Sequence, residues 1–135
     1  MGEPGLLYLD SSAIVKLIAV EPESAALVEW LRTGGPAIAS AIAKVEVQRA
    51  VNRLPTSQTM FERATDVLDR IALIKIDDAI LHQAALLRPA ELRSLDAVHL
   101  ATALSVREHL GAFVVYDRRL AEAAEVLGLT VASPE

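Results

Sequence analysis

Short apolar segments alternate with longer helical segments along the whole sequence of 135 residues. The first apolar segment, residues 5–9, has the composition of a buried strand, and the acid and two serines after it are residue types that begin helices. Further strand-like segments follow in the same alternation at residues 36–40, 73–76, 113–116 and 129–131. The pattern predicts one α/β domain over residues 1–135, a three-layer fold in which a mostly parallel sheet of about four or five short strands carries helices on both faces.

The segments between these strands have the spacing of apolar residues that amphipathic helices need. We expect helices at residues 10–20, 22–32, 40–53, 59–72, 77–88, 94–110 and 117–128. Pro22 is expected in a first helical turn, Ser40 at a helix N-cap and Gly128 just beyond a helix end. The sequence has no internal repeat and no low-complexity linker, which again favours a single domain.

The composition excludes several classes of protein. The absence of cysteine excludes disulfide bonds and thiolate metal sites such as zinc fingers. Charged residues interrupt every apolar stretch before the ~20 residues of a membrane span, and the N-terminal residues are acidic rather than basic. We therefore expect no membrane span, no signal peptide and a cytoplasmic protein. A net charge of −5 at first argues against a nucleic-acid partner, because phosphate binding usually requires a basic surface.

Four carboxylates occupy positions where a parallel sheet could bring them together. Asp10 and Asp117 each follow an expected strand, at the edge where open parallel sheets form ligand crevices. Asp96 lies in the first turn of an expected helix, so it can reach the same edge. Glu46 lies within the apolar arc of its helix, where burying a carboxylate alone is costly, so we expect a partner for it.

Each acid also has a simpler explanation. The two acids that follow strands could serve only as helix caps, and Asp96 could only interact with the helix dipole. Glu46 could pair with Arg49 or Arg53. Taken together, the four acids are better explained by a hard divalent cation, Mg2+ or Mn2+, which prefers oxygen ligands. His99, one turn after Asp96, is interpreted as a polar donor near this site and not as a ligand.

Several segments of the sequence resemble a known protein family. Residues 9–13 (LDSSA), the helix with Glu46, residues 94–103 (SLDAVHLATA) and residues 115–124 (VYDRRLAEAA) together resemble the PIN-domain ribonucleases and, among them, the VapC toxins of bacterial toxin–antitoxin pairs. The resemblance implies a PIN-like fold, and an acidic pocket for Mg2+, with Mn2+ as a possible substitute. It assigns to this pocket Asp10, Glu46, Asp96 and Asp117, with Ser11 or Ser12 as a hydroxyl near the metal.

The resemblance also implies partners. They are an RNA substrate, a second copy of the chain in a homodimer, and a small VapB-like antitoxin whose extended segment covers the acidic pocket. We expect the apolar surface for such a partner on the helices of residues 12–33 and 41–70.

The expected chemistry is hydrolysis of a phosphodiester. A cation held by carboxylates makes a water more acidic and neutralises phosphate charge, so neither a protein nucleophile nor the ribose 2′-hydroxyl is needed. The products then carry 5′-phosphate and 3′-hydroxyl ends, and the four acids could hold either one metal ion or two. Four of the negative charges belong to the acids themselves, so a local basic rim is compatible with the net charge. The rim is expected from Lys16, Lys44, Arg49, Arg53, Arg118 and Arg119.

Three other classes of function were compared with this hypothesis. A haloacid-dehalogenase-type phosphotransferase requires a second acid two residues after Asp10, where this sequence has Ser12. A response-regulator receiver requires paired acids and a lysine at a strand end, whereas Lys75 lies within an expected strand. A catalytically inactive PIN-like module that binds RNA or protein remains the alternative, since it would keep the fold without the reaction.

Overall fold

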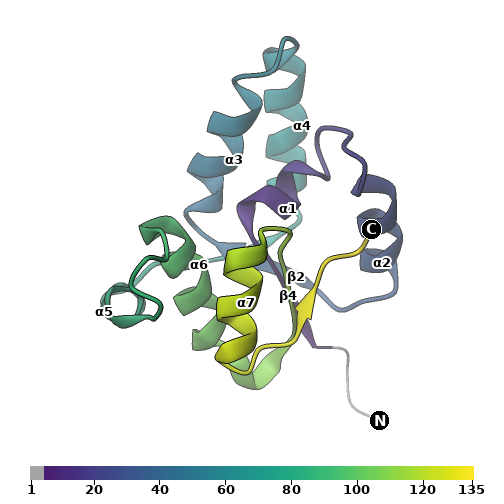
Figure 1. The fold of residues 1–135 in the computed structure, drawn as a ribbon. Helices are drawn as coiled ribbons and strands as arrows, with labels where there is room; N and C mark the ends of the chain where they lie inside the picture. The colour runs from purple at the N-terminus through teal and green to yellow at the C-terminus, as the bar shows by residue number, and fades with distance from the viewer. Residues whose placement is uncertain (1–4) are drawn as a thin grey trace.

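Five strands form one sheet at the centre of the computed structural model, which describes residues 5–135 (Figure 1). The strands are β1 (Leu6–Leu9), β2 (Ala37–Ser40), β3 (Ala72–Ile74), β4 (Leu110–Val114) and β5 (Val131–Ala132). Their order is β3-β2-β1-β4-β5 and all neighbours are parallel, which confirms the predicted α/β fold. Residues 1–4, on which the expectation of no signal peptide partly rests, lie outside the described residues. Within residues 5–135, no helix is both long and apolar enough to cross a bilayer.

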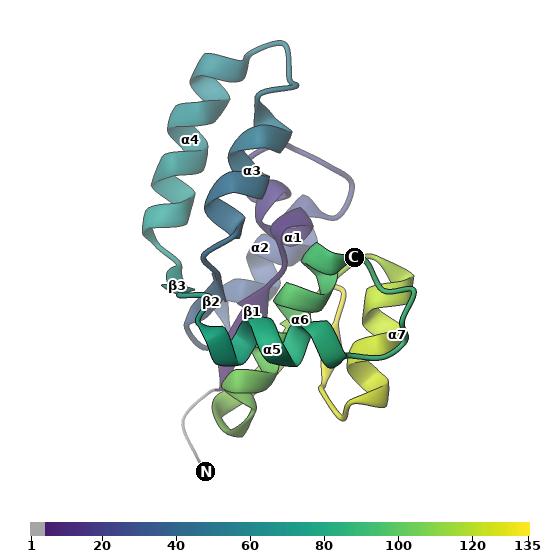
Figure 2. The same cartoon turned by 90° about the vertical axis from the view of Figure 1, so that its left-hand side faces the viewer.

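Helices cover both faces of the sheet, as the two views in Figures 1 and 2 show. The helices are α1 (Ser11–Val15), α2 (Ser24–Arg32), α3 (Ala43–Val51), α4 (Ser57–Asp69), α5 (Asp78–Leu86), α6 (Ser94–Ser105) and α7 (Arg118–Val126), with a 3-10 turn at Arg107–His109. One core lies beneath α1 to α4, a second lies beneath α6 and α7, and α5 packs against α6. The three-layer arrangement is therefore confirmed. α3 and α4 run side by side and project away from the sheet.

Successive side chains of the central strands enter different cores. Tyr8 and Phe113 belong to the core beneath α6 and α7, whereas their neighbours Leu9 and Val114 belong to the core beneath α1 to α4. All four side chains are completely buried. Side chains alternate between the faces of a strand, so a sheet covered on both faces requires continuous apolar strands. This explains why these strands could be recognised as short apolar runs.

The strand order creates a crevice at one edge of the sheet. From β1 the chain proceeds outward through β2 to β3, and then returns to place β4 on the opposite side of β1. The connections that leave β1 and β4 consequently diverge, and ligand crevices of open parallel sheets form at such a point. Asp10 directly follows β1, and Asp117 begins α7 shortly after β4. The topology thus brings two of the four predicted acids to the same crevice.

Two helices begin later than predicted. Ser40 is the last residue of β2, and its Oγ accepts the N–H of Ile42, which is the N-cap of α3. The serine therefore ends a strand and does not cap the helix. Pro22 precedes α2, because the chain first makes a turn in which the N–H of Ser24 bonds to the carbonyl of Glu21.

The predicted helix over residues 94–110 is wrong at its C-terminal end. α6 ends at Ser105, and β4 begins at Leu110, which pairs with Leu6 of β1. The two strands approach closely at glycines, since a Cβ atom on Gly5 would lie 2.5 Å from the Cα of Gly111. Pairing with β1 thus decides where the strand starts, and local helical preference does not.

α1 also ends earlier than predicted, at Val15. The next residue, Lys16, is nearly buried, and its Nζ lies 3.0 Å from Oε1 of Glu23 and 4.7 Å from the ring centroid of Tyr116. These contacts hold the segment between α1 and α2 against the residue that precedes Asp117. The ordered turn therefore borders the crevice.

Candidate active site

Asp10 follows β1 and begins α1, as predicted. Its Oδ1 accepts the N–H of Ala13 at 2.9 Å, and the Ser12 hydroxyl lies 2.9 and 3.0 Å from its two oxygens. Asp10 is only 6% exposed, so burial raises the pKa of its carboxyl, and the negative charge of Asp96 adds a smaller increase. Asp10 is therefore both a helix cap and a buried acid that a nearby cation would stabilise.

Glu46, on α3, is held by hydrogen bonds from two other helices. Its Oε1 accepts the Ser11 hydroxyl at 2.7 Å and lies 2.6 Å from Nε2 of His99. Burial alone would raise the pKa of Glu46, but the hydrogen bonds from His99 and Ser11 outweigh it, and the pKa lies below its ordinary value. Among the ion pairs of the described residues, Glu46 pairs with His99 and with neither Arg49 nor Arg53. The partner expected for this acid is thus His99.

His99 connects Glu46 to the centre of the sheet. It is 2% exposed, and its Nδ1 lies 2.7 Å from the hydroxyl of Tyr8 on β1. The Tyr8 ring stacks on Phe113 with centroids 5.2 Å apart and meets His99 edge-on. This placement agrees with the interpretation of His99 as a donor near the acids and not as a metal ligand.

Asp96 and Asp117 are bridged by an arginine. Nε of Arg93 lies 3.2 Å from Oδ2 of Asp96, and its Nη2 lies 3.8 Å from Oδ2 of Asp117. Asp117 also caps α7, because its Oδ1 accepts the N–H of Leu120 at 2.9 Å. The Arg93 side chain is 77% exposed, so each contact contributes little to stability. Arg93 matters mainly because its guanidinium places a positive charge between two of the predicted acids.

The four predicted acids reach one region from separate parts of the chain. The negative charge of Asp96 raises the pKa of Asp10, and the positive charge of Arg93 lowers the pKa of Glu46. Arg93 also contacts Asp117. Carboxylate oxygens are the donors that Mg2+ and Mn2+ prefer, and the bridging guanidinium already acts as a stand-in cation. In the part of the chain that the structure describes, no three acidic or histidine side chains lie close enough to form a complete metal site. The donor chemistry fits a divalent cation, around which the acids would have to draw together.

A cavity of about 520 Å³, here named the α1–α3 groove, opens beside Glu46. Three of the predicted basic rim residues line it, and they are Lys16, Arg49 and Arg53. The rest of its lining is largely apolar and consists of Val15, Ile42, Val45, Ala50 and Leu95, with Ser11, Ser12 and Glu21. The other predicted rim residues, Lys44, Arg118 and Arg119, are not among the lining residues. Of the three basic residues that line the groove, only Arg49 belongs to α3, since Lys16 follows α1 and Arg53 lies beyond the end of α3.

Comparison with known proteins assigns this chain to a family. The family described as PIN domain matches residues 7–126. The chain belongs to the PIN domain family. Ribonuclease VapC46 of Mycobacterium tuberculosis (strain ATCC 25618 / H37Rv) is 44% identical over 128 residues, which are 95% of this chain and 97% of the relative. Ribonuclease VapC35 of the same strain is 44% identical over 133 residues, which are 96% and 97% of the two chains.

A solved structure agrees with the PIN fold. A toxin–antitoxin complex from Klebsiella pneumoniae contains a chain with a TM-score of 0.73 and 22% identity, over 96% of this PIN domain and 98% of that chain. At this identity the likeness supports the fold alone. The VapC relatives at 44% identity confirm that the chain is a VapC-type PIN domain, as the sequence motifs indicated.

Sequence reasoning missed two residues of this PIN domain that contact the predicted acids or their partners. Arg93 stands three residues before Asp96, a spacing at which charged side chains of a helix meet, so a local signal was present. Tyr8 has the pattern of an ordinary core residue in a strand. Its contact with His99 joins positions 91 residues apart, and no local spacing predicts it.

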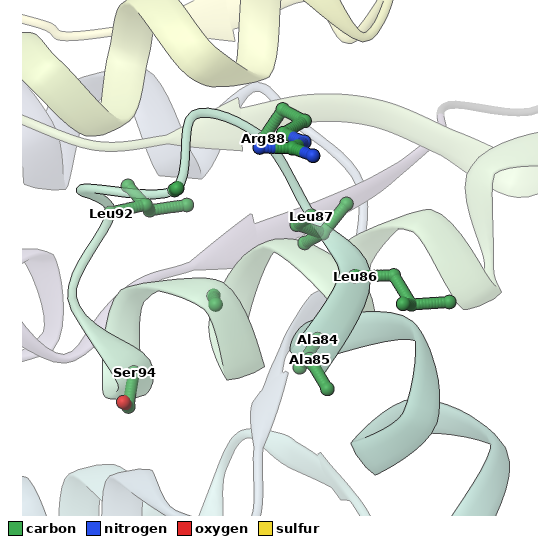
Figure 3. Close-up of a pocket in the computed structure, with 9 residues that line it drawn as sticks. Ala84, Ala85, Leu86, Leu87, Arg88, Leu92 and Ser94 are labelled. Carbon is green, nitrogen blue, oxygen red and sulfur yellow. The ribbon is translucent and has the colours of Figure 1, made fainter.

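A second cavity of this PIN domain lies between the end of α5 and the start of α6 (Figure 3). Its volume is about 360 Å³, and its lining includes Leu86, Leu87, Arg88, Leu92 and Ser94. None of the residues that line it carries a carboxylate. The cavity therefore lacks the donors of the acidic crevice, and metal-dependent chemistry is better placed at the crevice.

Proposed function

We propose that this PIN domain is a Mg2+-dependent endoribonuclease and acts as the toxin of a toxin–antitoxin pair. The observation that carries the proposal is the placement of Asp10, Glu46, Asp96 and Asp117 around one edge of a parallel sheet, where Arg93 bridges Asp96 and Asp117. Relatives at 44% identity are named ribonucleases, and the acids of this chain supply the donors that such a reaction needs. The cation is Mg2+, with Mn2+ as a substitute.

The four acids would together hold the cation. Asp10, Asp96 and Asp117 would supply carboxylate oxygens, and Glu46 would contribute Oε2, because Oε1 is engaged by Ser11 and His99. Bound Mg2+ supplies positive charge to the phosphodiester oxygens and makes a water more acidic.

The other polar residues orient these acids and the RNA. Ser12 bonds to both oxygens of Asp10 and Ser11 bonds to Glu46, so the two serines orient acids. Arg49 and Arg53, which line the α1–α3 groove, are placed to contact RNA phosphates. Water is the nucleophile, so the products would carry 5′-phosphate and 3′-hydroxyl ends.

The proposed partner is a small antitoxin of the VapB type. The Klebsiella pneumoniae structure is described as a toxin–antitoxin complex, and the α1–α3 groove of this chain combines an apolar lining with arginines. Exposed apolar side chains lie in the two segments predicted for such a surface, and they are Val20, Val28, Val45 and Phe61. A homodimer is also proposed, with the antitoxin segment covering the acidic crevice of each copy.

Cleavage of a defined RNA tests the proposed activity. Purified protein should cut single-stranded RNA in Mg2+ or Mn2+ and not in chelator, and ligation-dependent sequencing should find 5′-phosphate and 3′-hydroxyl ends. The matched control is Asp96→Asn, which keeps the size of the side chain but removes its charge. RNA binding without cleavage in either metal would favour the inactive binding module instead. Ends with a 2′,3′-cyclic phosphate would reject the proposed mechanism.

A further inference from the structure

A buried hydrogen-bonded network runs from the central strand to the candidate site. The Tyr8 hydroxyl lies 2.7 Å from Nδ1 of His99, and Nε2 of the same ring lies 2.6 Å from Oε1 of Glu46. Tyr8 is 0% exposed and His99 is 2% exposed. The three residues belong to β1, α6 and α3, so the network joins three elements that meet only in the folded protein.

The chemistry of Glu46 decides where the protons of this network lie. An ionised carboxylate only accepts hydrogen bonds, so Nε2 of His99 must be the donor in its contact with Glu46. The Tyr8 side chain is a phenol, which carries its proton at neutral pH and can donate a hydrogen bond. In neutral His99 the remaining nitrogen, Nδ1, is an acceptor, and the Tyr8 hydroxyl donates to it. The tyrosine thereby selects the tautomer that donates to Glu46.

The two carboxylate oxygens of Glu46 differ in their hydrogen bonds. The hydroxyl of Ser11 and the ring of His99 both bond to Oε1. Among the hydrogen bonds of the described residues, none involves Oε2. Glu46 also lines the α1–α3 groove. The carboxylate is therefore held by one oxygen, while the other remains available for an additional ligand.

We infer that Tyr8 and His99 are positioning residues, which hold Glu46 with Oε1 occupied so that Oε2 is free to bind the divalent cation. The inference rests on the proposed function, because it assigns a role within the same site. Hydrogen-bonding partners behind a metal ligand fix its orientation, and losing one commonly reduces metal affinity or activity by about 10–100-fold. Neither residue touches the cation or the RNA itself.

The main rival explanation is that the two residues only satisfy each other within the core. A phenylalanine at position 8 could still stack on Phe113, whose ring lies nearly parallel to that of Tyr8 at 16°. The Tyr8 hydroxyl bonds to Nδ1 of His99 and also has the backbone of Ser40 and the hydroxyl of Thr102 as neighbours. The other ring nitrogen of His99, Nε2, bonds to Glu46. A purely apolar pair would fill this core without ordering the carboxylate. The polar atoms are thus explained by the acid at the end of the network.

The test measures metal binding, because this readout does not depend on RNA cleavage. Titration calorimetry with Mn2+ should find affinity reduced by about 10–100-fold in His99→Ala. His99→Gln should stay within a few-fold of wild type, because its amide N–H can replace the donor, and Tyr8→Phe should be intermediate. Leu100→Ala is the matched control. Leu100 is completely buried in the same core as Tyr8 but makes no contact with Glu46 through a polar atom, so this variant should melt lower and still bind Mn2+ normally.

The tautomer of His99 provides a second readout that a packing role does not require. At about pH 8, where ordinary imidazole is neutral, 15N NMR should find a protonated Nε2 and an unprotonated Nδ1 in wild type. His82 and His109 are exposed and give internal references for freely exchanging tautomers. Tyr8→Phe should shift His99 toward that mixture.

The outcomes separate the inference from the proposed function. Wild-type Mn2+ affinity in His99→Ala, or a freely exchanging tautomer of His99 in wild type, overturns the positioning role even if the protein cuts RNA. An affinity loss in Leu100→Ala as large as that in His99→Ala also overturns it, since packing would then explain both. Conversely, a protein that cuts no RNA but has the expected order of Mn2+ affinities rejects the proposed activity and retains the positioning role.

Discussion

The guanidinium of Arg93 lies 3.2 Å from the carboxylate of Asp96, where the proposed function requires a divalent cation. The same guanidinium reaches within 3.8 Å of Asp117. A metal that binds both acids must therefore displace or reorient this side chain. Arg93 is largely exposed, so it can move away without disturbing the core.

Replacing Arg93 should strengthen metal binding. Arg93→Gln removes a competing positive charge, and the worth of an exposed ion pair predicts an increase in Mn2+ affinity of up to about fivefold. Calorimetry without RNA measures this directly. Arg118→Gln is the matched control, because Arg118 is an exposed arginine next to Asp117 and forms no ion pair among the described residues. Equal increases in both variants would mean that overall charge, and not the contact of Arg93, sets the affinity.

Replacing Asp96 should abolish activity without unfolding the protein. The N-cap of α6 is Arg93, and Asp96 forms an ion pair with it in place of a capping hydrogen bond. Asp96→Asn should therefore change the free energy of unfolding in chelator by less than about 1 kcal/mol. RNA cleavage should fall by orders of magnitude, and several millimolar Mg2+ should stabilise wild type more than the variant. A variant that melts far below wild type in chelator, with Mg2+ affecting neither protein, would make Asp96 a structural residue.

The buried carboxyl of Asp10 should make metal-free stability depend on pH. Its pKa is raised above 3.8 in the folded protein, so folding favours the protonated form. The associated stability is complete below 3.8 and is lost as the pH rises through the folded pKa. Asp10→Asn keeps an N-cap acceptor and removes the titration.

The difference between Asp10→Asn and wild type isolates this effect from other titrating groups. In chelator, the variant should be more stable than wild type at neutral pH, and the difference should shrink as the pH falls toward 3.8. Urea unfolding at several pH values measures the difference in free energy of unfolding. A difference independent of pH would show that Asp10 acts only as a cap.

The close approach of β1 and β4 predicts a different sensitivity at two glycines. A Cβ at Gly5 would lie 2.5 Å from backbone atoms of Gly111, whereas a Cβ at Gly111 would lie at least 3.1 Å from Gly5. Gly5→Ala should cost about 1–3 kcal/mol of stability, as overpacking does, and Gly111→Ala should cost less. Chemical denaturation of both variants tests the order. Equal stability of the two would indicate that the strands separate easily at this point.

Much of the fold and part of the site follow from local sequence. Apolar runs recur with strand length, and helices follow them, so the parallel three-layer architecture is predictable from short segments. Asp10 and Asp117 were also located correctly at helix starts, because each accepts an N–H only three residues away. Interactions within one helical turn depend on few residues, and their patterns are therefore visible in the sequence.

The remainder was decided by contacts between distant segments. β4 begins at Leu110 because it pairs with Leu6, although the local sequence favours a longer helix. The sequence indicated that Glu46 needs a partner, but it could not distinguish the nearby Arg49 and Arg53 from a partner elsewhere in the chain. Its actual partner, His99, lies 53 residues away in the sequence. The two side chains meet only because α3 and α6, which pack on opposite faces of the sheet, both reach the crevice at its edge. Local preference sets which element forms, whereas the packing of elements sets which side chains meet, because packing depends on the whole chain at once.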